Sequence, residues 1–330
     1  MKVKIIAEAG VNHNGSLRIA KKLVDVARFS GADYVKFQTF THDNLVTSKA
    51  QKANYQKSNH DNNETQSAML KKLELSKPNH LKLISYCKKK KIKFLSTAFD
   101  IENLKFLIKN KIDFIKIPSG EITNFPLLEY IKKSNKKILL STGASTLSEV
   151  KTALKILNKK KKEITVLQCN SAYPTPIKHL NLNTLTTFRK KFNCEVGLSD
   201  HSLSVVAAAA AVSLGATIIE KHFTLSRDMI GPDHKSSLEP SELKRMIQNI
   251  REIESALGNF NKNITKSERE NRRIIRKSLV ANNFIKKGQK FTSKNIFAKR
   301  PAGGISPMNI KKILGKKAKK NFELDEMIKI

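Results

Sequence analysis

Residues 195–201 read EVGLSDH, and residues 216–222 read ATIIEKH. Each stretch is a short apolar run that turns abruptly polar and ends in a histidine, which is typical of a buried strand followed by a loop. The alanine-rich segment between them, residues 205–214, predicts a helix. Because a helical crossover joins parallel neighbours, we expect both strands to end at the same edge of one sheet and to bring His201 and His222 together there.

A pair of histidines at one sheet edge suggests a metal site. Asp200 and Glu220 stand beside the two imidazoles in the sequence, and divalent cations are bound by imidazoles supported by carboxylates. The alternative is two unrelated surface histidines at loop starts. The adjacent carboxylates favour the metal, so the sequence predicts that His201 and His222 bind a divalent cation.

The rest of the chain repeats the same alternation of strand and helix. Helix-period stretches separate most of the short apolar runs, and a further helix is expected at 240–257. Eight such runs predict a closed (β/α)8 TIM barrel, whereas an open dinucleotide-binding sheet would carry a GxGxxG motif after its first strand. The expected strands are Val3–Ala7, Tyr34–Phe37, Lys93–Ser96, Phe114–Ile117, Lys137–Ser141, Ile164–Gln168, Glu195–Leu198 and Thr217–Ile219.

Two segments depart from this alternation. Residues 41–77 form a polar insertion rich in Asn and Lys, which we expect to be a loop or short helix over the active face. After Gly258 the barrel pattern stops. We therefore predict a TIM-barrel catalytic domain over 1–258, a linker over 259–277 containing a charged helix at 267–276, and a small C-terminal β-rich domain over 278–330.

The composition of the chain indicates which kinds of partner it binds and in which cellular compartment it works. The formal net charge is +35, but lysine far outnumbers arginine and occurs in runs such as Lys88–Lys91 at expected helix ends, where cations complement the helix dipole. This favours solvated helix ends over nucleic-acid binding. No apolar run is long enough to cross a membrane. The 3 cysteines form no CxxC pair, which fits a reducing cytoplasm.

Polar and ionisable side chains stand where nearly every expected strand ends. In a barrel these positions share one mouth, where catalysis takes place. Lys36 and Lys116 lie inside apolar strands, so each must project into the mouth and needs an anionic partner. A substrate that carries phosphate and carboxylate would satisfy both. The strand-end residues are Glu8, Lys36, Gln38, Thr97, Lys116, Ser119, Glu121, Thr142, Ser171, Tyr173, Ser199, His201, Glu220 and His222.

Several of these residues belong to longer motifs, which occur in the same order in a known family. The motifs are IIAEAGVNHNG at 5–15, VKFQT at 35–39, FLST at 94–97, IPSGE at 117–121, LSTG at 140–143, YPTP at 173–176, GLSDH at 197–201, IEKHFTL at 219–225 and GPDH at 231–234. Together they resemble the bacterial sialic acid synthase family. The tail, with KRP at 299–301 and GIS at 304–306, is similar to that family's antifreeze-like (SAF) domain.

The resemblance implies a reaction. Members condense phosphoenolpyruvate with an open-chain N-acylated amino sugar, using a divalent metal, Mn2+ or Mg2+, that His201 and His222 would bind. With N-acetylmannosamine the product would be N-acetylneuraminate. The alternative substrate is 2,4-diacetamido-2,4,6-trideoxymannose, which would give N,N'-diacetyllegionaminate.

The resemblance also implies roles for individual residues. Phosphate and carboxylate of phosphoenolpyruvate would be held by Lys36, Thr97, Lys116, Ser119, Ser171 and Ser199, with Gln38 beside them in the substrate site. Glu220 and Glu121 would handle protons, with Lys116 among the catalytic groups, and Glu8, Tyr173 and Asp233 would contact sugar hydroxyls. Arg300 would reach the sugar's acyl group from the second subunit of a domain-exchanged homodimer.

Two other readings stay open at the level of sequence. A class I aldolase would use Lys116 as a Schiff-base nucleophile, although the histidine pair argues against it. A non-catalytic sugar- or nucleic-acid-binding protein would use the basic surface instead. One departure from the family pattern is Gln168-Cys169-Asn170-Ser171, where members commonly show His-Cys-Thr.

Overall fold

The computed structural model of the chain describes residues 2–53, 56, 64–160 and 162–330. These fall into two compact units, Met1–Gly258 and Asn259–Ile330. Each unit has its own hydrophobic core, so each is described by itself.

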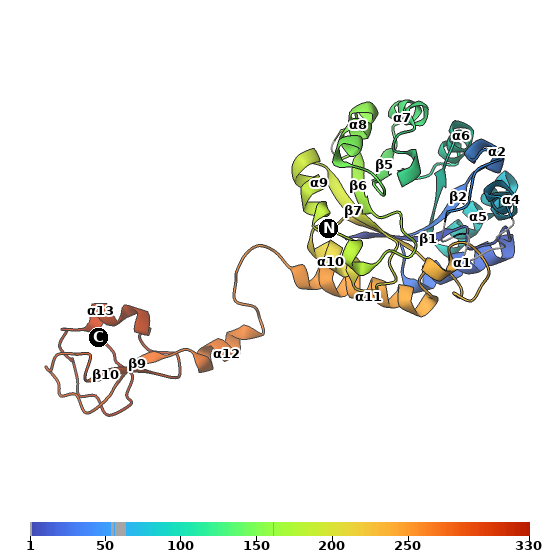
Figure 1. Cartoon of the computed structure of the whole chain (residues 1–330). Coiled ribbons are helices and arrows are strands. Elements are labelled where there is room, and N and C mark those ends of the chain that lie inside the picture. The colour runs from blue at the N-terminus through green and yellow to red at the C-terminus, as the bar shows by residue number, and fades with distance from the viewer. Residues whose placement is uncertain (1, 54–55, 57–63, 161) are drawn as a thin grey trace. The chain divides into compact units, whose positions relative to one another are not determined.

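The first unit is a closed barrel of eight parallel strands in the order β1 to β8. The barrel closes because β1 pairs with β8, with Glu8 in register with His222. This confirms the predicted (β/α)8 architecture (Figure 1). The strands are β1 (Lys4–Gly10), β2 (Tyr34–Thr39), β3 (Lys93–Ala98), β4 (Phe114–Ile117), β5 (Lys137–Ser141), β6 (Ile164–Cys169), β7 (Glu195–Asp200) and β8 (Ile218–His222).

Six of the strands run one to three residues further toward their carboxyl ends than the sequence predicts. The apolar runs stop where the polar residues start, whereas the backbone ladder continues through Glu8 and Gln38 to the barrel mouth. The reason is that parallel pairing depends on the backbone and tolerates polar side chains that point into a mouth. Several polar side chains therefore stand on strand backbone beyond the strand ends that we expected; they are Glu8, Gln38, Thr97, Ser199, Glu220 and His222.

Helices surround the barrel and bury one apolar stripe each. α1 (Leu17–Ser30) buries Ala20, Leu23, Val24 and Ala27, a spacing that follows the helical repeat. The other helices that pack on this unit's core are α5 (Lys77–Lys90), α6 (Ile101–Lys109), α7 (Phe125–Lys132), α8 (Leu147–Leu157), α9 (Thr184–Phe192), α10 (Ala207–Ser213) and α11 (Pro240–Leu257).

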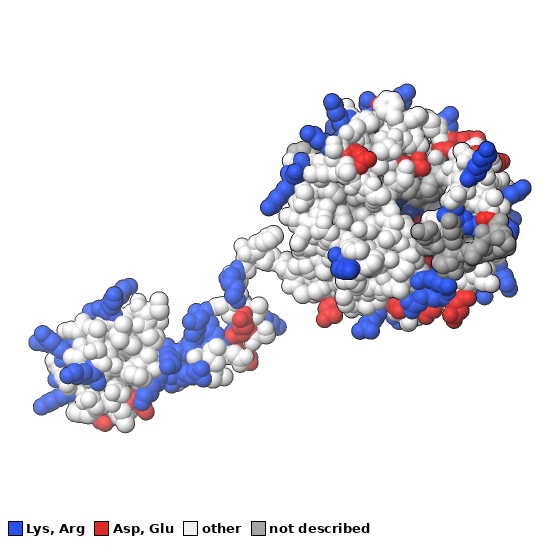
Figure 2. All heavy atoms as spheres, viewed as in Figure 1, with Lys and Arg blue, Asp and Glu red and all other residues white. Residues whose placement is uncertain are grey.

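One helix was not predicted from the sequence, and one prediction about lysines at helix ends is confirmed. The sequence analysis missed α9, whose Thr-rich start has low helix propensity, although its Leu185 and Phe188 are buried. The lysines 88–90 form the last turn of α5, as expected for cations at a helix carboxyl end. On the face seen in Figure 2, Lys and Arg side chains surround the barrel rather than cover its centre.

The insertion after β2 contains more structure than a polar loop. It includes α2 (His42–Leu45) and α4 (Gln66–Leu73), while residues 54–55 and 57–63 of this predicted segment lie outside the described residues. A separate apolar cluster joins the insertion to the barrel. It consists of Val11, Phe40, Met69, Leu70 and Leu73.

The first helix of the second unit is α12 (Glu268–Ile275), close to the helix expected at 267–276. It continues with an antiparallel pair, β9 (Ser278–Ala281) and β10 (Ile296–Lys299), and ends with the short helix α13 (Ile310–Ile313). Its core includes Leu279, Phe291 and Phe322. None of the helices in the described parts of the chain is long and apolar enough to cross a bilayer.

Candidate active site

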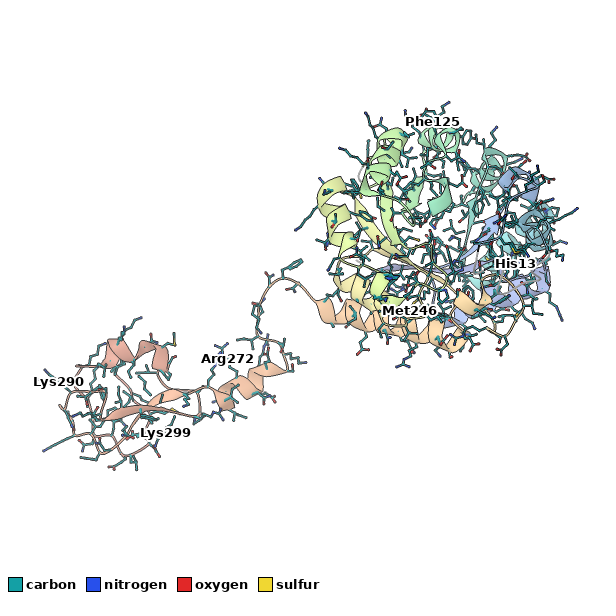
Figure 3. The ribbon with its side chains drawn as sticks, viewed as in Figure 1. His13, Phe125, Met246, Arg272, Lys290 and Lys299 are labelled. Carbon is teal, nitrogen blue, oxygen red and sulfur yellow. The ribbon has the colours of Figure 1, made fainter. Side chains whose placement is uncertain are left out.

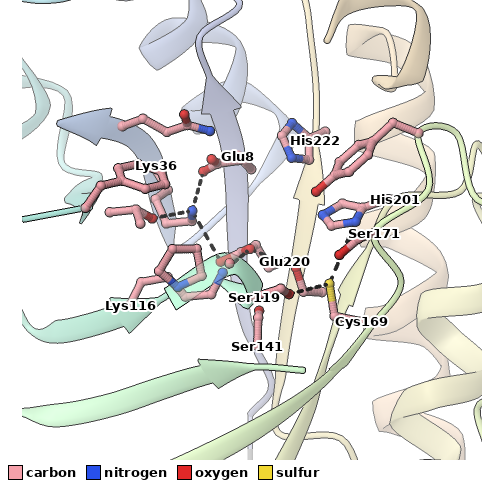
Figure 4. Close-up of a pocket in the computed structure, with 17 residues that line it drawn as sticks. Glu8, Lys36, Lys116, Ser119, Ser141, Cys169, Ser171, His201, Glu220 and His222 are labelled. Atoms are coloured by element: carbon pink, nitrogen blue, oxygen red, sulfur yellow. Dashed lines mark hydrogen bonds and ion pairs between the residues drawn. The ribbon is translucent and has the colours of Figure 1, made fainter. Parts of the chain in front are cut away.

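A pocket of about 240 Å3 lies at the carboxyl ends of the barrel strands (Figure 4). Its walls come from all eight strands and the residues just after them. Side chains along a strand alternate between two faces, so the pocket receives every second residue: Lys36 and Gln38 from β2, and Glu220 and His222 from β8. The lining comprises Glu8, Lys36, Gln38, Thr97, Phe99, Lys116, Pro118, Ser119, Gly120, Ser141, Cys169, Ser171, Tyr173, Ser199, His201, Glu220 and His222.

Two lysines and two glutamates form a buried charge network in this pocket. Lys36 Nζ lies 2.9 Å from Glu8 Oε2 and 3.6 Å from Glu220 Oε2. Lys116 Nζ lies 2.8 Å from Glu220 Oε1. The hydroxyl of Ser199 donates to Glu220 Oε1 at 2.9 Å, and Lys36 donates to the hydroxyl of Thr97 at 2.9 Å.

This network corrects one expectation. We expected a bound substrate to supply the anionic partners of Lys36 and Lys116, but the chain supplies them itself through Glu8 and Glu220. Each of the four residues is at most 5% exposed. Two buried cations and two buried carboxylates balance each other, as low-dielectric surroundings require. An incoming anion would have to share the two ammonium groups with these carboxylates.

The two carboxyls ionise differently. Burial alone would raise the pKa of Glu220, but Lys116 and Lys36 hold it well below its ordinary value. Burial raises the pKa of Glu8 to about 7, because only Lys36 lies against it and the negative charge of Glu220 opposes its ionisation. Glu220 is therefore the permanently charged member of the pair.

Small hydroxyl groups line the side of the pocket near β4, β5 and β6. Ser119 Oγ accepts a hydrogen bond from the Gly143 backbone N–H at 2.8 Å. A Cβ added at Gly143 would lie 2.4 Å from Ser171 Oγ and 2.8 Å from Ser119 Oγ, so only glycine lets these two side chains approach. The site thus presents clustered hydroxyl donors beside two ammonium groups, a combination suited to phosphate and carboxylate oxygens.

The two histidines come together as the sequence predicts. Their ring centroids are 5.2 Å apart, and Tyr173 stacks on His201 at 4.2 Å. His201 Nδ1 lies 2.6 Å from the Asn170 carbonyl oxygen, which can only accept, so Nδ1 carries the proton and Nε2 is left for a ligand. His222 Nδ1 is buried without a hydrogen-bond partner among the described residues and lies 4.0 Å from Asp233 Oδ2.

These features fit a cation held by two imidazoles. Burial, together with the nearby His201, puts the pKa of His222 well below its ordinary value, so its ring is neutral and able to donate a lone pair. The backbone hydrogen bond that fixes the His201 ring is the support that metal-bound histidines usually have. No group of three or more His, Cys, Asp or Glu in the described part of the chain could enclose a metal ion. Water or substrate would have to complete the coordination.

Asp200 does not support the metal site as we expected. Its side chain points to the opposite face of β7, where it accepts from Lys221 Nζ at 2.6 Å, and both residues are buried. Strand alternation explains this, since Ser199 and His201 face the pocket and the residue between them cannot. Glu220 does line the pocket but is engaged by the two lysines.

Five lining residues are not among the strand-end residues predicted from the sequence: Phe99, Pro118, Gly120, Ser141 and Cys169. Ser141 ends β5 and Cys169 ends β6, and both line the pocket. Counting back by two from Ser171 along β6 would have found Cys169. Burial alone would raise the pKa of the Cys169 thiol, but His201, with its Nδ1 at 3.7 Å, brings it down to about 7.

Four residues that the sequence predicts at the mouth lie apart from this pocket. Thr142 does not line it, because its hydroxyl donates to the Leu167 carbonyl oxygen at 2.9 Å. Glu121 is not among its lining residues, because its carboxylate accepts a hydrogen bond from Asn124 at the start of α7. Asp233 lines an adjoining hollow together with His222 and Tyr173. Arg300 belongs to the second unit, within the loop after β10. The chemical roles suggested for all the site residues stay predictions.

Comparison with known proteins identifies the family. Residues 23–262 match the model of the NeuB family, and residues 276–330 match that of the SAF domain. The chain is 50% identical to the N,N'-diacetyllegionaminic acid synthase of Campylobacter jejuni, over 99% of both chains. It is 40% identical to the enzyme of the same name from Legionella pneumophila, over 96% of this chain and 91% of that one.

A solved structure agrees with these matches. The N-acetylneuraminic acid synthetase of Leptospira borgpetersenii, crystallised with citrate, superposes with a TM-score of 0.72 at 34% identity, covering 82% of this chain and 90% of that one. The predicted fold and family are thereby confirmed. The chain belongs to the NeuB family of sialic-acid-type synthases and carries the family's C-terminal SAF domain.

Proposed function

We propose that this protein condenses phosphoenolpyruvate with 2,4-diacetamido-2,4,6-trideoxymannose and water, giving N,N'-diacetyllegionaminate and phosphate. The observation that carries the choice of sugar is the 50% identity to a legionaminic acid synthase over 99% of both chains. The similarity to an N-acetylneuraminic acid synthetase is 34%. This favours the diacetamido sugar over N-acetylmannosamine, which the motifs alone had put first.

The charge network and the hydroxyl groups suit phosphoenolpyruvate. Lys36 and Lys116 supply ammonium donors, and Thr97, Ser119, Ser171 and Ser199 supply hydroxyls around the same pocket. Phosphate and carboxylate oxygens accept such charge-assisted hydrogen bonds at both ends of the molecule. Gln38 lies on the same strand as Lys36, two residues on, and can orient the bound substrates from that side.

In the proposed reaction, carbon 3 of the enol attacks the sugar aldehyde and carbon 2 becomes electron-poor. Water then adds at carbon 2, and the tetrahedral intermediate loses phosphate. Glu220 is ionised between Lys36 and Lys116, so its carboxylate can stabilise the positive character at carbon 2. Glu8, whose pKa is about 7, can take up or release a proton near neutral pH.

His201 and His222 would hold a divalent cation, Mn2+ or Mg2+, beside this network. When bound, such a cation supplies Lewis acidity toward a carbonyl oxygen. Tyr173 stacks on His201 and restricts its ring, which keeps the two imidazoles directed into the pocket. Asp233 and Tyr173, at the side of His222, are placed to hydrogen-bond sugar hydroxyls.

We also propose that the protein works as a domain-exchanged homodimer in the cytoplasm. In this arrangement Arg300 of one subunit would contact the acyl group of the sugar in the barrel of the other. The 3 cysteines are free thiols, which suits a reducing compartment.

A phosphate-release assay tests the proposed function. Phosphate should appear only when phosphoenolpyruvate, the diacetamido sugar and a divalent metal are all present, and N-acetylmannosamine should be the poorer substrate. His201→Ala and exhaustive chelation should each abolish release. Activity that survives both treatments would refute the metal assignment, and faster turnover of N-acetylmannosamine would refute the choice of sugar.

A further inference from the structure

A second hollow of about 100 Å3 opens beside the main pocket. The two share Gln38, Tyr173 and His222, so a molecule bound at the histidines can extend from one into the other. None of the described residues that line the hollow is a lysine or arginine. The ammonium groups that suit phosphate and carboxylate all lie in the main pocket, so the hollow suits the uncharged part of a bound substrate.

Part of the wall of the hollow is an apolar cluster. It consists of Val11, Met69, Leu70 and Leu73, which are 5%, 1%, 9% and 4% exposed. Three of these side chains come from α4 in the insertion after β2, at positions that share one face of the helix. We call this set the methyl floor.

The backbone fixes the methyl floor against the barrel. The Lys72 carbonyl of α4 packs so closely on Gly15 that a Cβ there would lie 2.5 Å from it. The same floor residues pack with Phe40, just after β2. The floor is therefore a preformed surface rather than a loose loop, and it lines the same hollow as His222.

We propose that the methyl floor receives carbon 6 of the sugar and makes the enzyme prefer a 6-deoxy sugar, which ends in a methyl group, to one that ends in a primary alcohol. This inference rests on the proposed function and identifies the residues that select the sugar. The aldehyde end of an open-chain sugar would lie at the histidines, so the opposite end reaches outward into the hollow.

Desolvation gives the expected size of the preference. A methyl group loses nothing when it leaves water for an apolar surface, whereas a hydroxyl there gives up its hydrogen bonds to water without replacement. Apolar pockets discriminate against one added hydroxyl by about 10- to 100-fold. Polar residues line the rest of the hollow and can serve the sugar's other hydroxyl and amide groups; they are Gln38, Gln56, Tyr173, His222 and Asp233.

Four sugars test the proposal. They are 2,4-diacetamido-2,4,6-trideoxymannose and its 6-hydroxy counterpart, and N-acetylmannosamine and its 6-deoxy counterpart. The members of each pair differ by one oxygen atom. In phosphate release by the full-length protein, kcat/KM should favour the deoxy member of each pair by about 10- to 100-fold.

Variants test which residues are responsible. Met69→Gln and Leu70→Gln place an amide in the floor and should bring the ratio within each pair close to one, mainly by lowering kcat/KM for the deoxy member. Met69→Leu, which keeps the floor apolar, should retain the preference. Leu45→Gln is the matched control, because Leu45 packs on the same cluster but does not line the hollow. Its ratio should equal that of the wild type.

The outcomes separate this proposal from the proposed function. A wild-type ratio near one in both pairs, or an unchanged ratio in both glutamine variants, would overturn the role of the floor. If only the N-acetylmannosamine pair is turned over, the proposed sugar is wrong, yet the preference for a methyl group is still measured in that pair. Turnover of none of the four sugars would overturn both.

Discussion

His13 shows how a buried group can make stability depend on pH without taking part in the chemistry. His13 lies in the barrel unit (Figure 3), and its ring is fully buried. Its Nδ1 accepts a hydrogen bond from the Gly15 backbone N–H at 3.0 Å. Burial, with smaller contributions from His80 and His234, lowers its pKa from 6.5 to about 3. The folded protein therefore keeps His13 neutral where an unfolded chain would protonate it.

The lowered pKa of His13 determines whether stability rises or falls with pH. Below about pH 6.5 the unfolded chain binds a proton that the folded chain does not, so stability falls as the pH decreases toward 3. Between pH 7 and pH 5 the contribution of His13 to the free energy of unfolding should fall by about 2 kcal/mol. Urea denaturation followed at several pH values would measure it.

His13→Asn is the informative variant. The oxygen of the asparagine side chain can still accept a hydrogen bond from the Gly15 N–H, and asparagine does not titrate in this pH range. The variant should be less sensitive to acid than the wild type, whatever its stability at pH 7. Equal slopes of stability against pH for the two proteins would show that His13 is not the group responsible.

At the scale of elements, the loops after β5 and β4 must approach each other to form one wall of the pocket. Gly143 allows this approach, because any side chain there would displace Ser119 and Ser171. Gly143→Ala should leave the barrel folded and raise KM for phosphoenolpyruvate by about 10- to 100-fold, since small displacements of binding groups have effects of this size.

The control for this variant is a thermal denaturation curve, measured together with the steady-state kinetics, which shows whether the protein is folded. An unchanged KM for phosphoenolpyruvate in a folded Gly143→Ala protein would mean that Ser119 and Ser171 do not hold this substrate. A large drop in melting temperature would instead place the effect in the barrel itself.

The sequence predicted the elements of the barrel better than their ends. Apolar runs located all eight strands because burial on both sides leaves a continuous hydrophobic signal. That signal stops at Glu8, Gln38 and Glu220, although the backbone ladder continues through them. The Thr-rich start of α9 carries no helical signal, since its helix is stabilised by packing of Leu185 and Phe188.

Within the site, the sequence predicted which residues lie together but not which of them form ion pairs with one another. The pairing of Lys36 with Glu8 depends on the register of β1 and β2, in which these two residues are partners. Asp200 faces outward for a different reason, which is the alternation of side chains along β7. Sequence spacing does not fix the register between neighbouring strands, so the sequence predicted a substrate anion where a glutamate stands.

At the scale of the whole molecule, the chain consists of two units with separate cores, and its candidate site residues are divided between them. All the pocket residues belong to the barrel unit, whereas Arg300 belongs to the second unit. If the small domain is exchanged between subunits, one intact barrel and one intact small domain from different chains should suffice for activity.

Mixing two inactive chains tests this exchange. An Arg300→Ala chain and a Glu220→Gln chain should each be inactive alone and should recover part of the wild-type activity when refolded together, because one mixed site then has both residues. Absence of recovery, with heterodimers demonstrated by differential tags, would contradict the exchange.

The insertion that carries α4 has a consequence for how such enzymes diversify. The charged network stands on strands of the closed hydrogen-bond ladder, apart from the insertion. Three of the four residues of the methyl floor stand on a segment inserted between β2 and α5, outside that ladder. Replacing this one segment could therefore redirect the same chemistry to a different sugar without any change to the strands that carry the charged network.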